Sequence, residues 1–200
     1  MIGILISGRG SNMMSIIDAC ASGRIPASVG IVISNEPSAP GLAAAAGHGI
    51  PTRVVDHRVP GRREEHDDRI ADALRQAGVD LICLAGYMRL LSAGFIREFS
   101  GRVMNIHPSL LPAFPGLHAQ RQAIEQGVRI TGATVHFVDE GLDSGPVILQ
   151  AAVPVQQDDT EETLSARILE QEHRIYPEAI GLHFMDRLRI EGRRVRITGR

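Results

Sequence analysis

The sequence contains no lysine, because all 21 of its Lys and Arg residues are arginine. This absence excludes mechanisms that form a Schiff base on lysine, and it excludes the phosphate-binding loop that requires Gly-Lys-Ser/Thr. Binding of carboxylate or phosphate is still expected, since the arginine guanidinium group binds both. The formal net charge is only −2, so no overall positive field predicts binding to nucleic acid.

Cysteine is also scarce, and the two that are present, Cys20 and Cys83, belong to no CxxC pair. This pattern excludes thiolate zinc sites and redox motifs of that type. Both cysteines lie in apolar stretches, so we expect buried free thiols in a reducing compartment, the cytoplasm. No apolar run approaches the ~18 residues that span a bilayer, and the N-terminus does not resemble a signal peptide.

The first half of the chain alternates short apolar runs with longer helical patterns, which predicts a parallel sheet covered on both faces. Strands are predicted at Ile2–Ile6, Val29–Ile33, Thr52–Val55, Leu81–Leu84 and Val103–Ile106. Helices are predicted at Asn12–Ala21, Gly41–Gly49, Arg62–Ala77 and Ala93–Phe99. We find no linker and no repeat, and 200 residues that are 44% hydrophobic suffice for one core. We therefore expect a single domain over residues 1–200.

The second half follows a different pattern, in which prolines after His107 indicate an irregular loop before a helix over Ala119–Gln126. The next two strands are joined too closely for a crossover helix, so they are expected to be antiparallel. A long helix should follow an Asp159/Glu162 capping box and kink or break at Pro177. The two strands are expected at Gly132–Val138 and Val147–Val153, and the long helix at Thr160–Arg187. A hairpin with an arginine-rich face is expected at Leu188–Ile197. The predicted class is α/β, a Rossmann-like three-layer sandwich with antiparallel C-terminal strands extending the parallel sheet.

A glycine-rich segment, Gly8-Arg9-Gly10-Ser11-Asn12, follows the first strand and opens the first helix. Glycine lets the backbone approach an anion closely, and free N–H groups at a helix start bind phosphate. The alternative is a tight turn with Ser11 as the helix N-cap. The dinucleotide fingerprint requires a third glycine where this chain has Met13, so we favour a mononucleotide phosphate. Glu36 is interpreted as an exposed loop carboxylate rather than as a ribose ligand.

Asn105 and His107 end the last predicted parallel strand and, two residues apart, project to the same face. This edge of a parallel sheet is where such folds bind ligands, and both side chains can donate hydrogen bonds to a developing oxyanion. The alternative is a structural histidine and a turn-capping asparagine. Asp143 lies in a glycine-flanked loop, and a carboxylate beside a histidine favours the imidazolium and raises its pKa.

No metal site is predicted, because His107, His118 and His136 show no ligand spacing such as HExxH. The last segment carries six arginines from Arg187 to Arg200. No aromatic residues are interleaved there to stack on bases, so we expect no nucleic-acid partner.

Taken together, these motifs resemble the phosphoribosylglycinamide formyltransferases, the folate-dependent transformylases of purine synthesis. The matching segments follow the family's order over nearly the whole chain. They are Leu5–Asn12, Leu84–Arg89, Asn105–Pro112, Phe114–His118, Leu142–Pro146 and Gln171–Pro177. The Asn-x-His…Asp set marks the wider formyltransferase superfamily, and the Gly-x-Gly-Ser-Asn and Phe-Pro-Gly-Leu-His segments narrow the resemblance to this family.

The resemblance implies formyl transfer from 10-formyltetrahydrofolate to the amine of glycinamide ribonucleotide, by a monomer or homodimer and without a metal. Asn105, His107 and Asp143 match the catalytic residues. Four residues match the substrate phosphate and ribose contacts: Gly10, Ser11, Asn12 and Glu172. The folate contacts match Arg63, next to Arg62, together with Met88, Arg89, Leu90, Leu91, Asn105, Glu140, Gly141, Leu142, Asp143 and Ser144.

The alternatives are a formyltetrahydrofolate hydrolase or another formyltransferase of the superfamily. A hydrolase is expected to carry a regulatory domain before the first strand, which here begins at residue 2. A methionyl-tRNA formyltransferase is expected to carry a further C-terminal domain. A nucleotide-dependent oxidoreductase is disfavoured by Met13, and a non-catalytic nucleotide-binding module would have no need for the Asn105, His107 and Asp143 set.

Overall fold

In the computed structural model, which describes residues 1–199, the chain divides into two units, Met1–Met104 and the residues from Asn105 onward. The first unit holds four parallel strands in the order β3-β2-β1-β4. Their bounds are β1 Ile2–Ile6, β2 Val29–Ser34, β3 Thr52–Val54 and β4 Leu81–Leu84. All five residues of β1 are buried, as expected of a strand covered on both faces.

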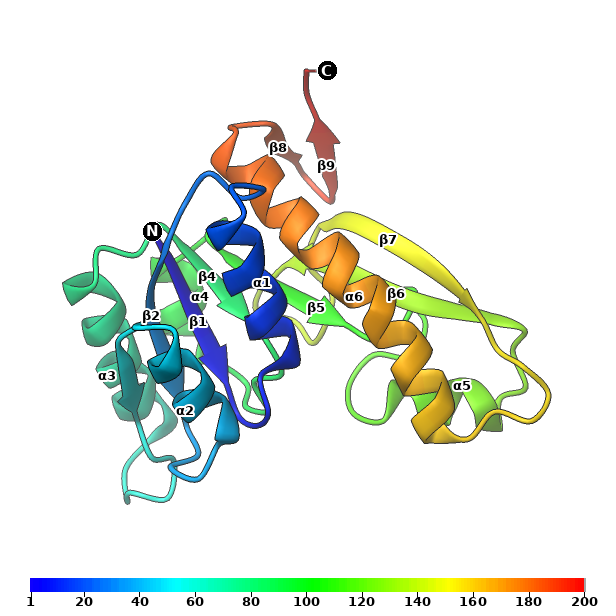
Figure 1. The fold of residues 1–200 in the computed structure, drawn as a ribbon, viewed down its shortest axis with the longest axis horizontal. Coiled ribbons are helices and arrows are strands. Elements are labelled where there is room, and N and C mark those ends of the chain that lie inside the picture. The colour runs from blue at the N-terminus through cyan, green and yellow to red at the C-terminus, as the bar shows by residue number, and fades with distance from the viewer. Residues whose placement is uncertain (200) are drawn as a thin grey trace. The chain divides into compact units, whose positions relative to one another are not determined.

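Four helices flank these strands, with α1 and α2 packed together on one face and α3 and α4 on the other (Figure 1). They are α1 Ser11–Ala21, α2 Pro40–Gly47, α3 Arg63–Gln76 and α4 Ala93–Glu98. The amphipathic α3 buries Ile70 and Leu74 completely, which explains its 3.6-residue apolar period. The strand β5, Val103–His107, begins in the first unit and ends in the second.

The second unit is built around the antiparallel pair β6 Ile130–Phe137 and β7 Val147–Pro154, as the short connection predicted. The helix α6, Glu161–Phe184, packs against both strands and contacts α5, Ala119–Glu125 (Figure 1). A hairpin of β8 Leu188–Glu191 and β9 Arg194–Ile197 follows, with β9 pairing parallel to β7. Gly132 is required where β6 meets β7, because a Cβ there would lie 1.9 Å from the Ala151 carbonyl oxygen.

The long helix has a different N-cap from the one expected, and it does not break at Pro177. Its N-cap is Thr160, which forms a reciprocal capping box with Thr163, whereas both Asp159 carboxylate oxygens accept hydrogen bonds from Arg167 at 2.8 Å. The helix also continues past Pro177 and ends at Phe184. Proline removes one backbone donor, but Pro177 and the fully buried Tyr176 beside it lie on the helix face that packs into the core.

Two smaller differences concern the first unit. Gly10, with φ of +75°, is the N-cap of α1, and Ser11 is the first helical residue, so the alternative interpretation, with Ser11 as the N-cap, is wrong. Cys83 is buried as expected, but Cys20 is only partly buried, and both are free thiols. Among the described residues, no helix combines the length and the apolar character that crossing a membrane would require.

Candidate active site

Asn105 and His107 lie at the carboxyl end of β5, and both belong to the second unit. His107 is 5% exposed, and both of its ring nitrogens lie near acceptors. Nε2 is 2.8 Å from the Phe114 carbonyl oxygen, and Nδ1 is 3.4 Å from Asp143 Oδ2. A carbonyl on one side and a carboxylate on the other can accept from both N–H groups of a doubly protonated ring. Each ring nitrogen of His107 therefore faces an acceptor.

Asp143 approaches this histidine from the loop between β6 and β7. Its backbone has φ of +48°, a left-handed conformation that Asp and Asn adopt more readily than most residues. Its Oδ2 also accepts the backbone N–H of Gly116 at 2.8 Å. The carboxylate is thus held by the irregular segment after β5 as well as by its own loop, and its side chain is only 13% exposed.

His136 also belongs to this cluster, although its sequence context showed only that it has no metal-ligand spacing. Its Nε2 lies 3.3 Å from Asn105 Nδ2 and 3.8 Å from Asp143 Oδ1. Its Nδ1 lies 2.9 Å from the Phe137 carbonyl oxygen, which can only accept, so the proton resides on Nδ1 and Nε2 accepts from Asn105. Desolvation by burial lowers the pKa of His136, against smaller opposing effects of the Phe137 carbonyl and Asp143. Nothing in the residue pattern of β6 signals this contact.

The cluster can stabilise a negative charge. One Asn105 amide N–H points to His136, which leaves the other N–H of the same nitrogen to donate elsewhere. His107 lies at the same end of β5, with its Nδ1 3.4 Å from Asp143 Oδ2. A carboxamide donor and a cationic ring in a largely dry setting are the groups that stabilise an oxyanion in acyl transfer. Among the described residues, no group of three or more His, Cys, Asp or Glu side chains is arranged to hold a metal ion.

The predicted phosphate loop lies in the first unit. Gly10 adopts φ of +75°, and a Cβ there would lie 3.0 Å from the Met13 side chain, so glycine is favoured on both grounds. Gly10 is followed directly by the first residues of α1, Ser11 and Asn12, and the positive end of the helix dipole favours an anion there. The structure thus has the turn followed by a helix that the sequence predicted for this segment.

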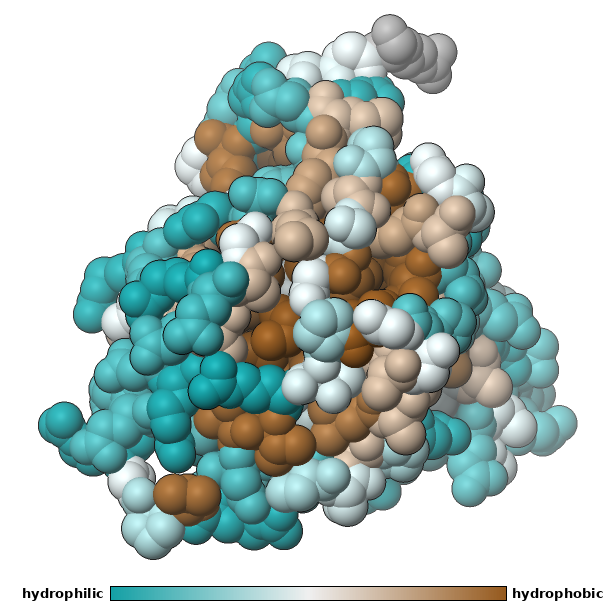
Figure 2. Space-filling model, turned by 60° about the vertical axis from the view of Figure 1, so that its left-hand side comes forward, coloured by the Kyte–Doolittle hydropathy of each residue, from teal (hydrophilic) through white to brown (hydrophobic). Residues whose placement is uncertain are grey.

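The predicted folate segment, Met88–Leu91, follows β4 in the first unit. Met88 and Leu90 are 67% and 60% exposed, so their apolar side chains are accessible to a ligand. Exposed apolar side chains also show in brown on the face drawn in Figure 2. Arg63 begins α3 and makes no hydrogen bond or ion pair with the described residues, whereas Arg62 binds Glu65. Of the two adjacent arginines, Arg63 is thus the one available to a ligand.

The remaining predicted contacts lie in the second unit. Glu172 is 7% exposed on α6, and the Nε2 atom of its neighbour His173 is buried without a hydrogen-bond partner among the described residues. Glu140, Gly141, Leu142 and Ser144 lie in the Asp143 loop, where Asp139 accepts hydrogen bonds from the Gly141 N–H and the Ser144 hydroxyl. The loop is therefore held by its own polar contacts.

Comparison with known proteins shows where this chain belongs. The formyl transferase family model matches residues 1–180. The trifunctional purine biosynthetic protein adenosine-3 of Drosophila melanogaster is 51% identical over 183 residues, which are 90% of this chain and 14% of that protein. The chain thus spans about a seventh of that relative's length.

Two relatives match over nearly their whole length. The phosphoribosylglycinamide formyltransferase of Haemophilus influenzae is 45% identical, with 100% of this chain and 94% of that protein covered. The crystal structure of glycinamide ribonucleotide transformylase 1 from Symbiobacterium toebii is 55% identical, with a TM-score of 0.97 over 99% of this chain and 93% of that one. This likeness confirms the predicted α/β fold class. The chain belongs to the formyl transferase family and, within it, to the phosphoribosylglycinamide formyltransferases.

Proposed function

We propose that this chain transfers the formyl group of 10-formyltetrahydrofolate to the amino group of glycinamide ribonucleotide, in de novo purine synthesis. The products are formylglycinamide ribonucleotide and tetrahydrofolate. The observation that carries the proposal is the cluster of Asn105, His107 and Asp143 in the second unit, with a carboxamide donor and a histidine whose Nδ1 lies 3.4 Å from a carboxylate oxygen. The full-length relatives carry the name of this activity.

The reaction begins with attack by the neutral amine of the acceptor on the formyl carbon. An α-amino group titrates near pH ~8, so a useful fraction is neutral at physiological pH and no strong enzymic base is required. A C–N bond forms, and the carbonyl electron pair moves onto oxygen to give a tetrahedral oxyanion. The bond from carbon to N10 of the folate then breaks, and the proton lost by the amine is transferred to N10. The protein therefore contributes mainly by stabilising the oxyanion.

In this proposal, Asn105 donates its second amide N–H to the oxyanion, and the His107 imidazolium supplies a positive charge. The His107 Nε2–H donates to the Phe114 carbonyl in the structure, so direct donation from this atom requires that contact to open when substrates bind. Catalytic hydrogen bonds often form only in the substrate complex. Asp143 holds the imidazolium in place through Nδ1.

The substrates are assigned to the loops already described. The backbone of Gly10, Ser11 and Asn12 is proposed to bind the phosphate, and Glu172 to bind the ribose. The folate is assigned to Arg63, Met88–Leu91, Asn105 and the Glu140–Ser144 loop. Residues 1–200 are proposed to act as one domain, a monomer or homodimer of the cytoplasm that uses small molecules only and no metal.

The test is incubation of the purified chain with both substrates, with formylated acceptor and tetrahydrofolate each quantified. Equal amounts of the two products are expected, and none without acceptor. Release of formate and tetrahydrofolate in the absence of acceptor would instead indicate a formyltetrahydrofolate hydrolase, the alternative that uses the same donor. Methionyl-tRNA is tested as an acceptor to control for methionyl-tRNA formyltransferase activity, and its formylation would contradict the proposal.

A further inference from the structure

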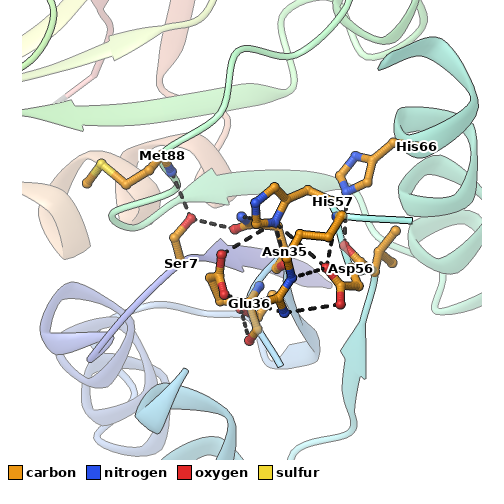
Figure 3. Close-up of polar contacts among 10 residues, drawn as sticks. Ser7, Asn35, Glu36, Asp56, His57, His66 and Met88 are labelled. Atoms are coloured by element: carbon orange, nitrogen blue, oxygen red, sulfur yellow. Dashed lines mark hydrogen bonds and ion pairs between the residues drawn. The ribbon is translucent and has the colours of Figure 1, made fainter. Parts of the chain in front are cut away.

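A chain of hydrogen bonds in the first unit joins the ends of three strands to the start of the proposed folate segment (Figure 3). The hydroxyl of Ser7, which follows β1, accepts the backbone N–H of Met88 at 2.8 Å. The same hydroxyl donates to Oδ1 of Asn35, which follows β2, at 2.5 Å. The main chain that follows β4 is thus tied to a side chain beyond β1, and that side chain is tied to one beyond β2.

Ser7 contacts this segment a second time through its backbone, because its N–H donates to the Gly86 carbonyl at 3.1 Å. Gly86 has φ of +74°, so the chain turns there as it leaves β4. The Met88 side chain is 67% exposed and contributes little burial to hold its own backbone. Apart from the burial of the preceding residue, Tyr87, the position of the Met88 amide depends on its hydrogen bond to the Ser7 hydroxyl.

Asn35 determines which way that hydroxyl points. A serine hydroxyl has one proton, and donating it to Asn35 leaves an oxygen lone pair for the Met88 N–H. Asn35 is 4% exposed, and its Nδ2 lies 3.2 Å from Nδ1 of His57. The same His57 nitrogen lies 2.9 Å from the Asn35 carbonyl oxygen. His57 also lies 3.4 Å from Glu36. The Asn35 oxygen near His57 is its backbone carbonyl, which can only accept, so His57 Nδ1 donates to it and does not also accept from Nδ2. Asn35 is therefore held by Ser7 through its side-chain oxygen and by His57 through its main chain (Figure 3).

We propose that Ser7 and Asn35 are positioning residues for the formyl donor. They hold the Met88 amide, and through it the main chain of Met88–Leu91, in the conformation that binds the folate. The inference rests on the proposed function, since it assigns a role in the same reaction to two residues outside the catalytic cluster. Neither residue is expected to contact the reacting atoms, so their loss should weaken binding of the donor and spare the chemical step.

The test compares Ser7→Ala with Ser7→Thr, which keeps the hydroxyl, and with the control Ser22→Ala. The Ser22 hydroxyl bonds to carbonyl groups at the end of α1 and to the side chain of Arg24, and to nothing in the Met88 segment. Loss of one hydrogen bond predicts a rise of about three- to tenfold in the donor KM of Ser7→Ala. The acceptor KM and kcat should stay within about twofold, since only donor binding is affected. Ser7→Thr should restore the donor KM, and Ser22→Ala should not change it.

A double-mutant cycle tests whether the two residues act together. Asn35→Ala alone should raise the donor KM, but it should add little in the Ser7→Ala background, because both changes break one chain of contacts. Additive effects of the two substitutions on the donor KM would contradict the proposal that Ser7 and Asn35 act together. Equal rises in donor and acceptor KM, or an unchanged donor KM in Ser7→Ala, would also overturn the inference.

Hydrogen exchange of the Met88 amide provides a readout that needs no substrate. Exchange should be faster in Ser7→Ala than in wild type, and unchanged in Ser22→Ala, at equal global stability in urea. If wild type transfers no formyl group and does not bind tetrahydrofolate, the proposed function fails whatever the exchange result. If wild type is active and Met88 exchange does not change in Ser7→Ala, only the positioning role fails.

Discussion

Replacing Asp143 with asparagine isolates the charge of the carboxylate from its shape. The two side chains have the same size, and the left-handed backbone at this position, with φ of +48°, suits asparagine as well as aspartate. The amide oxygen of asparagine can still accept the Gly116 N–H that Asp143 accepts at 2.8 Å. What the variant loses is the negative charge 3.4 Å from His107 Nδ1.

The magnitude follows from that distance. At an effective dielectric constant near 20, two unit charges 3.4 Å apart attract by roughly 5 kcal/mol. The His107 and Asp143 side chains are 6% and 13% exposed, so solvent screens the pair only weakly, although the asparagine dipole and relaxation recover part of the loss. A net cost of about 2–4 kcal/mol to the charged ring corresponds to a fall in kcat of roughly 30- to 1,000-fold. The KM values should change little, because the charge acts on the transition state.

The assay is steady-state formyl transfer with both substrates varied, accompanied by urea unfolding. Asp186→Asn is the matched control, since Asp186 also has a left-handed backbone, with φ of +54°, but pairs with Arg189 beside the hairpin. It should leave kcat unchanged. If Asp143→Asn kept kcat within about threefold of wild type, the 3.4 Å pair would contribute under ~1 kcal/mol, and the charge-balance argument would be refuted.

Three further changes test other parts of the structure. His107→Ala should lower kcat by about 100- to 1,000-fold while substrate dissociation constants, measured by calorimetry, stay near wild type, as expected for a group that stabilises the oxyanion; parallel loss of binding would contradict this. Burial lowers the pKa of His136, so the unfolded chain binds more protons and stability should fall as pH drops below ~6.5. Urea unfolding at pH 7.5 and 5 should show a smaller loss for His136→Gln, which cannot titrate, and an equal loss would be evidence against a buried neutral ring. Gly145→Ala should destabilise by about 3 kcal/mol or more, because its Cβ would lie 1.8 Å from the Phe137 carbonyl oxygen, whereas Gly47→Ala, with open space around it, should leave the urea midpoint at or above wild type.

The parallel strands were predictable because their signal is local. A strand covered on both faces has an uninterrupted apolar run, and β1 and β4 have the predicted bounds because every residue in them is buried. The start of α6 was not predictable in the same way. Asp159 and Thr160 are both good caps, and the choice depends on Arg167, which binds Asp159 from two turns along the helix. Continuation through Pro177 likewise depends on packing that the sequence does not display.

The candidate site was predictable where residues share one strand, and less so where they do not. The two-residue spacing of Asn105 and His107 placed them together, and the structure brings Asp143 to within 3.4 Å of His107 from a loop 36 residues later. The backbone contacts of Phe114 with His107 and of Gly116 with Asp143 could not be predicted from the sequence, because almost every residue has a backbone carbonyl and an N–H. Nor was the Asn105–His136 contact, since β6 carries a register irregularity between Val135 and His136.

That missed contact determines what Asn105 can do. The Phe137 carbonyl fixes the proton of His136 on Nδ1, so Nε2 accepts and the Asn105 nitrogen, not its oxygen, faces the ring. Protonation of His136 would put an N–H against the Asn105 NH₂, and the amide would turn its oxygen toward the ring. The turn would reorient the N–H that we assign to the oxyanion. Burial that keeps the pKa of His136 low therefore protects the orientation of Asn105, and in His136→Gln that orientation should no longer respond to acid.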